Sequence, residues 1–359
     1  MDAERILSFR LARVGLAGRA PAGLAGAVAC PASDFHRNAG LLAVSARRRR
    51  LTRAAYDEAV DAGDLVVAHV VRGAIHVLAP DDFALFGRAL VATDDDELAK
   101  QIGRQFTRIT TEHGIAPTAA LAEVTAATKD ALAGGAALGK VDLHQALRER
   151  VRPELMPWCN GCRSHHVAPM LWRYATVEAG VRLDAERRYR LGRPGRKPPA
   201  AEAVRRFLRW YGPARPGGFA DWAGLSRPHA DRLWGGIEDE LAEAGDGWVL
   251  RRDVHALDSP PAAEGVHFIP PGDPYLAKPN RALLAPDDAL RKRLFRPVAS
   301  PGVVLQDGRL VGLWRARAKG KATEVSVEKL GRVARAALEP EAERIAGVQG
   351  AGRAVLVVG

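Results

Sequence analysis

Two cysteines and two histidines lie within eight residues of one another, as Cys159, Cys162, His165 and His166. Thiolate and imidazole are the ligand types that zinc prefers. Structural zinc sites usually separate two pairs of ligands by a longer loop, so tetrahedral ligation by all four residues is awkward at this spacing. We therefore expect a tight turn before a helix, with small buried cysteines, a capping histidine and no metal. Zinc binding is the alternative.

Basic residues gather in three stretches of the chain: residues 47–50, residues 187–197, and the alternating cations after Trp314. Such clusters bind phosphate without reading base sequence, and the alternative for each is a solvated face. An indole beside alternating cations on a hairpin can insert into a groove of DNA or follow it. The candidate DNA contacts from these stretches are Arg187, Arg188, Trp314, Arg315, Arg317 and Lys319.

The overall composition agrees with a folded protein that binds a polyanion. Of the 359 residues, 47% are apolar, and 53 Lys plus Arg exceed 42 Asp plus Glu to give a formal charge of +11. Double-stranded DNA is the natural partner of such a charge, although an Arg-rich composition also follows from a GC-rich genome. We expect no membrane span and no export signal, and three cysteines predict a reducing cytoplasm. Walker, Rossmann and Gly-x-Ser-x-Gly motifs are missing, so no nucleotide or other cofactor is expected.

The clearest local architecture lies between residues 200 and 258. Apolar residues recur at helical spacing until Gly212-Pro213, which predicts an amphipathic helix. A second short helix follows, and Ser226 is placed to cap a third. Residues 248–257 then have the pattern of β structure. Three helices followed by a β-ribbon are typical of a winged helix-turn-helix.

A similar order precedes this segment. Residues 51–60 have a helical pattern, and residues 65–78 form two β-rich arms joined at Arg72-Gly73, which is typical of a wing. Pro80-Asp81-Asp82 then begins another helix, with its aspartates near the positive end of the helix dipole. Helices dominate residues 94–180, which we interpret as a further, degraded copy of the module.

The chain changes character after Pro260. Helix breakers at residues 270–274, and Asp307-Gly308 between two apolar runs, predict a small β domain. We expect an α+β protein with tandem winged helix-turn-helix modules followed by a small C-terminal β-barrel-like domain. The expected units are a first winged-helix module at residues 1–93, a second, mostly helical one at 94–190, a third at 199–258, and a β-rich domain at 265–359.

Several segments, in this order, resemble the AlkZ-like family of bacterial DNA glycosylases, which are also described as winged-helix DNA-binding proteins. The landmarks are Arg72 to Val77 followed by Pro80 to Asp82, Trp158 to Cys162 with His165 to Val167, Tyr211-Gly212-Pro213, Pro270 to Tyr275, Val303 to Gly308, and Trp314 to Arg317. The resemblance implies tandem winged helices and a small β-barrel. It also implies removal of alkylated purines or unhooking of interstrand crosslinks in DNA, without a metal or an organic cofactor.

In that family the chemistry is attributed to a short motif before the first wing: a polar residue, an aliphatic residue, then Gln or Asp. Counting from the landmarks places this motif at Pro31-Ala32-Ser33. An alkylated purine leaves readily, so such a site mainly stabilises an oxocarbenium-like sugar and positions a water. Proline has no polar side chain, and Ser33 lacks the reach of Gln and the charge of Asp. The candidate catalytic residues are therefore Ser33, with Asp34 or His36 as substitutes.

The resemblance also includes the Arg-Gly-x-x-His run from Arg72 to His76. Arg72 could contact a phosphate, with a surface ion pair as the alternative. His76 could act near a flipped or damaged base. His69, in the neighbouring β-rich arm, is expected in the core.

Three functions stay open at this point. The first is a DNA-binding protein whose glycosylase motif has degenerated, acting as a damage binder, a structure binder or a regulator. The second is an active glycosylase for alkylated purines or crosslinks. The third is a winged-helix transcription factor that reads an operator through residues 226–234, where Arg227, His229 and Arg232 could contact bases.

Overall fold

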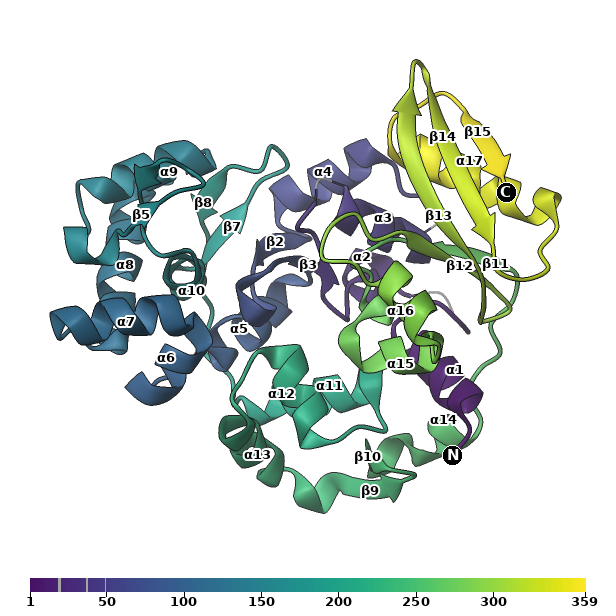
Figure 1. Cartoon of the computed structure of the whole chain (residues 1–359), viewed down its shortest axis with the longest axis horizontal. Helices are drawn as coiled ribbons and strands as arrows, with labels where there is room; N and C mark the ends of the chain where they lie inside the picture. The colour runs from purple at the N-terminus through teal and green to yellow at the C-terminus, as the bar shows by residue number, and fades with distance from the viewer. Residues whose placement is uncertain (19–20, 37, 49) are drawn as a thin grey trace.

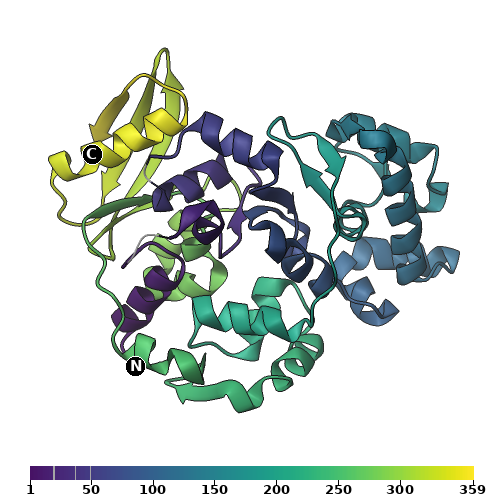
Figure 2. The ribbon, with the colours of Figure 1, turned by 180° about the vertical axis from the view of Figure 1, so that it is seen from behind.

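The computed structural model describes residues 1–18, 21–36, 38–48 and 50–359 of this mixed α+β protein. Helices of residues 95–179 lie at one end of the long axis, and the C-terminal sheet lies at the other (Figure 1). The N-terminal elements lie between them in both views (Figures 1 and 2). None of the helices in the described ranges has the length and apolar composition needed to span a bilayer.

A central sheet joins the N-terminal segment to the helical region. Its strands follow the order β1-β3-β2-β7-β8-β4, and Val67 of β2 pairs with Leu183 of β7. The sheet therefore spans residues on both sides of the boundary expected at 93/94. The strands are β1 (Ala32–Ser33), β2 (Val66–His69), β3 (Ile75–Leu78), β4 (Ala137–Leu138), β7 (Val181–Leu183) and β8 (Tyr189–Leu191).

The two arms expected as a wing are the middle of this sheet. β2 and β3 pair antiparallel, and every residue of both strands is buried. Their connection at Arg72-Gly73 has positive φ at both residues, 57° and 62°. The two strands were therefore predicted. Their pairing with β1 on one side and β7 on the other was not, because long-range pairing leaves no local sequence pattern.

Short helices surround the N-terminal strands. They are α1 (Ala3–Arg13), α2 (Gly23–Ala27), α3 (Ala39–Arg47), α4 (Arg53–Ala62) and α5 (Phe83–Phe86). Thr52 caps α4 through its hydroxyl, which accepts from the backbone N–H of Ala55 at 3.2 Å. Gly63 ends α4 with a φ of 85°. The helix predicted at residues 51–60 is thus confirmed.

The region expected to be mostly helical contains α6 (Asp95–Ile102), α7 (Arg104–His113), α8 (Pro117–Ala131), α9 (Lys140–Arg148) and α10 (Pro169–Ala179). Its core includes Leu121, Leu147 and Leu171, which are buried between these helices. A short hairpin of β5 (Trp158–Cys159) and β6 (Ser164–His165) lies between α9 and α10.

Residues 201–258 contain the three predicted helices and a two-stranded ribbon. Ser226 caps the third helix by accepting from the N–H of His229 at 3.2 Å. The predicted β run at 248–257 is a strand only to Leu250, and its partner β9 was not anticipated. The elements are α11 (Ala201–Tyr211), α12 (Pro216–Ala223), α13 (Arg227–Gly235), β9 (Leu241–Ala244), β10 (Gly247–Leu250) and α14 (Val254–Asp258).

The C-terminal part is an open five-stranded sheet in the order β11-β12-β13-β14-β15, with α17 against one face (Figures 1 and 2). The predicted hairpin is present, with Asp307 and Gly308 at positive φ as a two-residue turn requires. No pairing joins β11 to β15 within the described ranges, so the expected barrel-like closure is not seen there. The elements are β11 (Val266–Ile269), α15 (Arg281–Leu284), α16 (Asp288–Leu294), β12 (Gly302–Gln306), β13 (Arg309–Lys319), β14 (Ala322–Lys329), α17 (Arg335–Val348) and β15 (Ala354–Val358).

Segments far apart in sequence share the same cores. One apolar cluster joins Leu11, Phe207, Tyr275 and Leu313, and a second joins the central sheet to α17. The buried Arg10 donates to the carbonyls of Gly212 at 3.1 Å and Pro213 at 2.7 Å and to Asn280 Oδ1 at 2.8 Å. Elements from all parts of the chain therefore position the region around β1.

Candidate active site

Pro31, which directly precedes strand β1, and Ser33 of β1 line a pocket of about 250 Å³. Ala32 lies between them and is 2% exposed, in the core. Alternate residues of a strand face opposite sides, so the first and third positions of the three-residue segment share the pocket. Ser33 pairs with His76 across β1 and β3, and His76 lines the same pocket.

The loop at residues 270–274 forms the opposite wall. Its Gly272 carbonyl accepts the backbone N–H of Ser33 at 3.2 Å. Gly272 has a φ of 83°, and a Cβ there would lie 3.2 Å from the Cβ of Ser33. Glycine is therefore required twice, for the backbone conformation and for the close approach to Ser33.

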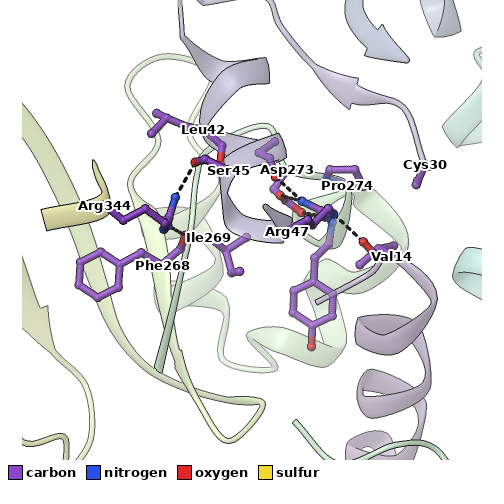
Figure 3. Close-up of polar contacts among 12 residues, drawn as sticks. Val14, Cys30, Leu42, Ser45, Arg47, Phe268, Ile269, Asp273, Pro274 and Arg344 are labelled. Atoms are coloured by element: carbon purple, nitrogen blue, oxygen red, sulfur yellow. Dashed lines mark hydrogen bonds and ion pairs between the residues drawn. The ribbon is translucent and has the colours of Figure 1, made fainter. Parts of the chain in front are cut away.

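A buried ion pair fixes this loop (Figure 3). Arg47 of α3 donates to both carboxylate oxygens of Asp273, at 2.7 and 3.0 Å. The two side chains are 2% and 0% exposed. Arg47 also donates to the carbonyl of Val14 at 2.6 Å, and the hydroxyl of Tyr211 donates to that of Pro274 at 2.9 Å. The wall of the pocket is thus held from three distant segments.

A second arginine joins the same region to the C-terminal helix (Figure 3). Arg344 of α17 donates to the hydroxyl of Ser45 at 2.6 Å and to the carbonyl of Phe268 at 3.0 Å. It also pairs with Glu341 at 2.8 Å. α17 and β11 are thereby tied to α3, the helix that carries Arg47.

His76 is a neutral imidazole with one nitrogen left to accept. Burial lowers the pKa of His76 to about 4, although the carbonyl of Ala74 opposes the shift. Nδ1 lies 2.9 Å from that carbonyl oxygen. Because a carbonyl only accepts, Nδ1 must carry the proton and Nε2 the lone pair. His76 can therefore accept a hydrogen bond from a water in the pocket near neutral pH, while its lowered pKa makes it a weak proton acceptor.

Three cations surround the mouth of the pocket: Arg72, Lys278 and Arg281. Lys278 pairs with Asp221 at 2.8 Å, and the guanidinium of Arg281 lies over the ring of Phe295 at 4.6 Å. Burial lowers the pKa of Arg281, and the nearby charge of Arg72 lowers it further. Neither arginine has an ion-pair partner among the described residues, so both are available to an anion.

Asp34 and His36 do not line this pocket. The carboxylate of Asp34 faces the other side of β1, where it accepts from the N–H of Gly40 at 2.8 Å and pairs with Arg187. Burial raises the pKa of Asp34, and Arg187 opposes that shift. His36 is exposed, with its ring edge-on to Phe35. Ser33 is therefore the only one of the three predicted catalytic residues at the pocket.

Arg187 and Arg188 are largely occupied by the chain itself. Arg187 donates to the backbone carbonyl of Asp34 at 2.8 Å besides pairing with its carboxylate. Arg188 pairs with Asp184 at 2.9 Å and Glu186 at 3.1 Å. Asp34, a predicted catalytic residue, is thus paired with Arg187, a predicted DNA contact. This ion pair orients the segment that follows β1.

The alternating cations of β13 are exposed, but Trp314 is not. Arg315, Arg317 and Lys319 share one face of the strand, whereas Trp314 points to the other face and is 3% exposed. Its indole N–H donates to the carbonyl of Ile269 at 3.1 Å, and the ring stacks on Phe268. The expectation that Trp314 contacts DNA is corrected: in this position the ring supports the sheet.

The exposed cations of β13 are partly neutralised. Arg317 and Lys319 pair with Glu324 at 2.6 and 2.8 Å, and Arg315 donates to the carbonyl of Ala299. Of the basic run at 47–50, Arg47 is buried, Arg48 and Arg50 are exposed, and Arg49 lies outside the described residues. Arg48 and Arg50 line a separate pocket of about 710 Å³, and Arg315 lines another of about 360 Å³. Asp34 and Arg187 line a small pocket of about 30 Å³ on the other side of the sheet. Ser33 lines none of these three pockets.

Lys278, Arg281, Tyr211 and Trp222 were not anticipated as pocket residues. The landmarks Tyr211-Gly212-Pro213 and Pro270 to Tyr275 lie directly beside them. These landmarks are far apart in sequence, so only the tertiary fold shows that they meet at Ser33.

The chain is a DNA glycosylase-like protein and belongs to the AlkZ-like family, because a family model described as "DNA glycosylase AlkZ-like" matches residues 30–348. Its structure is similar to Streptomyces sahachiroi DNA glycosylase AlkZ, with a TM-score of 0.76 and 20% sequence identity over 100% of each chain. That likeness establishes a shared fold. No curated protein matches the sequence.

Proposed function

We propose that this chain binds double-stranded DNA and accepts a displaced base in the pocket between β1, β3 and the 270–274 loop. The observation that carries the proposal is the orientation of β1. Pro31 and Ser33, at the place where the family resemblance puts the catalytic motif, face the pocket that His76 and Arg72 also line. A base that leaves the duplex can be held there while the cations at the mouth bind flanking phosphates.

The proposed binding surface includes winged-helix modules. α11, α12, α13 and the β9–β10 ribbon supply the helix order of such a module, and Gly224 at the end of α12 packs under the stem of Arg72. We propose that this contact aims the Arg72 guanidinium at the DNA backbone beside the pocket, as a phosphate contact that positions the duplex without reading its sequence.

Recognition without turnover is the function that the pocket chemistry favours. Asp273 is the one carboxylate among the described residues that line the pocket, and Arg47 occupies both of its oxygens. Ser33 and His76 are left to hold a water, and neither carries the negative charge that stabilises an oxocarbenium-like sugar. We propose a binder of damaged, crosslinked or distorted DNA.

A second candidate is an active N-glycosylase for cationic alkylpurines. The neutral His76, with Nε2 free to accept, favours it, because Ser33 and His76 could together orient a water at the sugar. Such a substrate already carries the charge that makes the base a good leaving group. Both the binder proposal and this enzyme proposal include a preference for damaged DNA over intact duplex.

A transcription factor that reads an operator through α13 has less support. Arg227 pairs with Asp231 at 2.8 Å, and Ser226 bonds to Glu97, which also lies 3.9 Å from His229. These polar groups contact the chain itself. Arg227 and Arg232 are both exposed, and Arg232 is the one without an ion pair among the described residues.

Salt-dependent DNA binding tests the first proposal. Affinity for plain duplex should fall steeply with salt, and Arg72→Gln and Arg281→Gln should each lower the salt slope by about 1, as expected for loss of one phosphate contact. Arg108→Gln removes the same charge from an exposed residue of α7 paired with Glu112 and should leave the slope near that of the native chain. Salt-independent binding, or equal effects of all three variants, would contradict this role.

Release of 7-methylguanine from alkylated DNA separates binder from enzyme. As a binder, the native chain releases no base above background, and the Pro31→Gln, Ser33→Asp double variant gains release because it places a polar side chain and a carboxylate toward the pocket. As an enzyme, the native chain releases base, and Ser33→Ala or His76→Gln abolishes the activity. His36→Ala serves as the comparison, since His36 is exposed and does not line the pocket.

A further inference from the structure

The β5–β6 hairpin brings three metal-binding groups together outside the pocket. The sulfurs of Cys159 and Cys162 and a ring nitrogen of His166 all lie within 4.8 Å of one another. Ligands of one tetrahedral zinc lie about 3.8 Å apart when the zinc–sulfur bonds are about 2.3 Å. The three groups therefore need to close by about 1 Å or less to share one ion.

The neighbouring histidines have different positions. His166 places Nδ1 2.8 Å from the carbonyl of Val167, so Nδ1 carries the proton and Nε2 is the free lone pair, the tautomer of a metal ligand whose other nitrogen is oriented by a carbonyl. His165 instead directs Nδ1 to the carbonyl of Met156 at 3.0 Å and packs its ring against Trp158. His165 is therefore not a zinc ligand in this arrangement. The objection that four ligands within eight residues cannot share one tetrahedral ion no longer applies.

The turn of the hairpin leaves room beside the thiol of Cys159. Gly161 leaves open space above the turn, since a Cβ there would meet only that sulfur, at 4.0 Å.

The hairpin has little else to hold it in place. Each strand contains two residues, and Trp158, which begins the hairpin, is 53% exposed. Isolated two-stranded hairpins are marginal in water, and a metal ion supplies the folding energy that a small core cannot. Val167 and Ala168, which follow His166 directly, are buried at the start of α10. A metal here would fasten the hairpin to that helix.

We propose that Cys159, Cys162 and His166 bind one zinc ion, with water in the fourth position, as a structural site of the helical region. His144 packs beside His166 with ring centroids 5.3 Å apart, but its nitrogens fall outside the group, so three protein ligands are assigned. Cys162 is exposed, so the fourth position faces solvent. None of these residues lines the Ser33 pocket, so the site has no part in base recognition or chemistry.

Metal analysis of the full chain tests the site. The protein is purified under reducing conditions without chelator, dialysed first against zinc and then against metal-free buffer. It should retain about one zinc per chain. Cys162→Ser and His166→Gln should each lose most of this zinc, whereas His165→Gln should retain it. Cobalt in place of zinc should give the thiolate-to-cobalt absorption and the intense visible bands of tetrahedral coordination, both abolished in Cys162→Ser.

Each remaining outcome overturns the proposal. The first such outcome is reduced protein that retains no zinc. The second is equal zinc content in His166→Gln and His165→Gln. The third is a Cys159–Cys162 disulfide in freshly purified protein that binds no metal after reduction. DNA binding by Cys162→Ser should match that of the native chain. Failure of the metal site is therefore distinguishable from failure of the DNA-binding proposal.

Discussion

Ser33 and Asp34 are neighbours in sequence but serve opposite faces of the central sheet. Ser33 lines the pocket, and Asp34 holds Arg187 and the N–H of Gly40 on the other face. A side chain on a strand changes face with every residue. Asp34 therefore cannot substitute for a missing motif carboxylate without a register shift that would move Ser33 out of the pocket.

The Arg47–Asp273 pair should be the most sensitive single contact of the site. Asp273→Asn leaves the buried guanidinium without its countercharge, so the free energy of unfolding should fall by about 3–5 kcal/mol. Urea unfolding monitored by tryptophan fluorescence measures the loss. Glu112→Gln, which breaks the exposed Arg108–Glu112 pair, should leave the unfolding midpoint near that of the native chain. Equal midpoints for both variants would show that the buried pair does not hold the loop.

The loop at residues 270–274 depends on one backbone conformation. Gly272→Ala must adopt a φ of 83° and place its Cβ 3.2 Å from that of Ser33, so it should lose about 1–2 kcal/mol for the conformation alone and more for the contact. Gly265→Ala is the matched control, because Gly265 has a φ of 75° and nothing within 4 Å of a Cβ.

Both glycine variants carry the same strain of a positive φ, so the difference in stability between Gly272→Ala and Gly265→Ala measures the contact with Ser33. Chemical denaturation should place Gly272→Ala below Gly265→Ala in stability, and Gly272→Ala should also weaken DNA binding, because the wall of the pocket moves. Identical stability and affinity in both variants would mean that the approach of the loop to Ser33 is unimportant.

Local patterns predicted elements better than they predicted the site. Helices α11 to α13 and the Asp307-Gly308 turn follow from periodicity, capping and turn chemistry, which act over a few residues. The pairing of Val67 with Leu183 does not, since no local rule brings those residues together. For the same reason Arg281 and Lys278 could not be predicted as pocket residues. The position of Trp314 could have been predicted, because side chains alternate along β13 and Trp314 therefore faces away from the neighbouring cations.

The stability of the whole molecule should fall with acid because of two buried histidines. Burial lowers the pKa of His69 to about 3 and that of His76 to about 4. Below the ordinary pKa of 6.5 the unfolded chain takes up protons that the folded chain excludes, so the stabilisation is complete above pH 6.5 and is lost as the pH falls toward these values. Each histidine then contributes a slope of about 1.4 kcal/mol per pH unit.

Denaturation at pH values from 7 down to 5 checks this expectation. The free energy of unfolding should decline steadily, and His69→Gln should show a shallower decline whatever its own stability at neutral pH. His69 lies in the core and bonds to Thr176 at 2.9 Å, away from the Ser33 pocket. An unchanged slope in this variant would show that His69 is not held neutral by burial.

The pairing of Arg47 with Asp273, 226 residues further along the chain, also bears on how the protein is made. During synthesis α3 and β1 leave the ribosome long before the segment that neutralises Arg47 and covers Ser33. Until then an arginine destined for the interior has no countercharge, and the edge of β1 that will meet Gly272 is open to other strands. The nascent chain therefore cannot complete the Ser33 pocket domain by domain, and a fragment ending before residue 273 lacks one wall of that pocket.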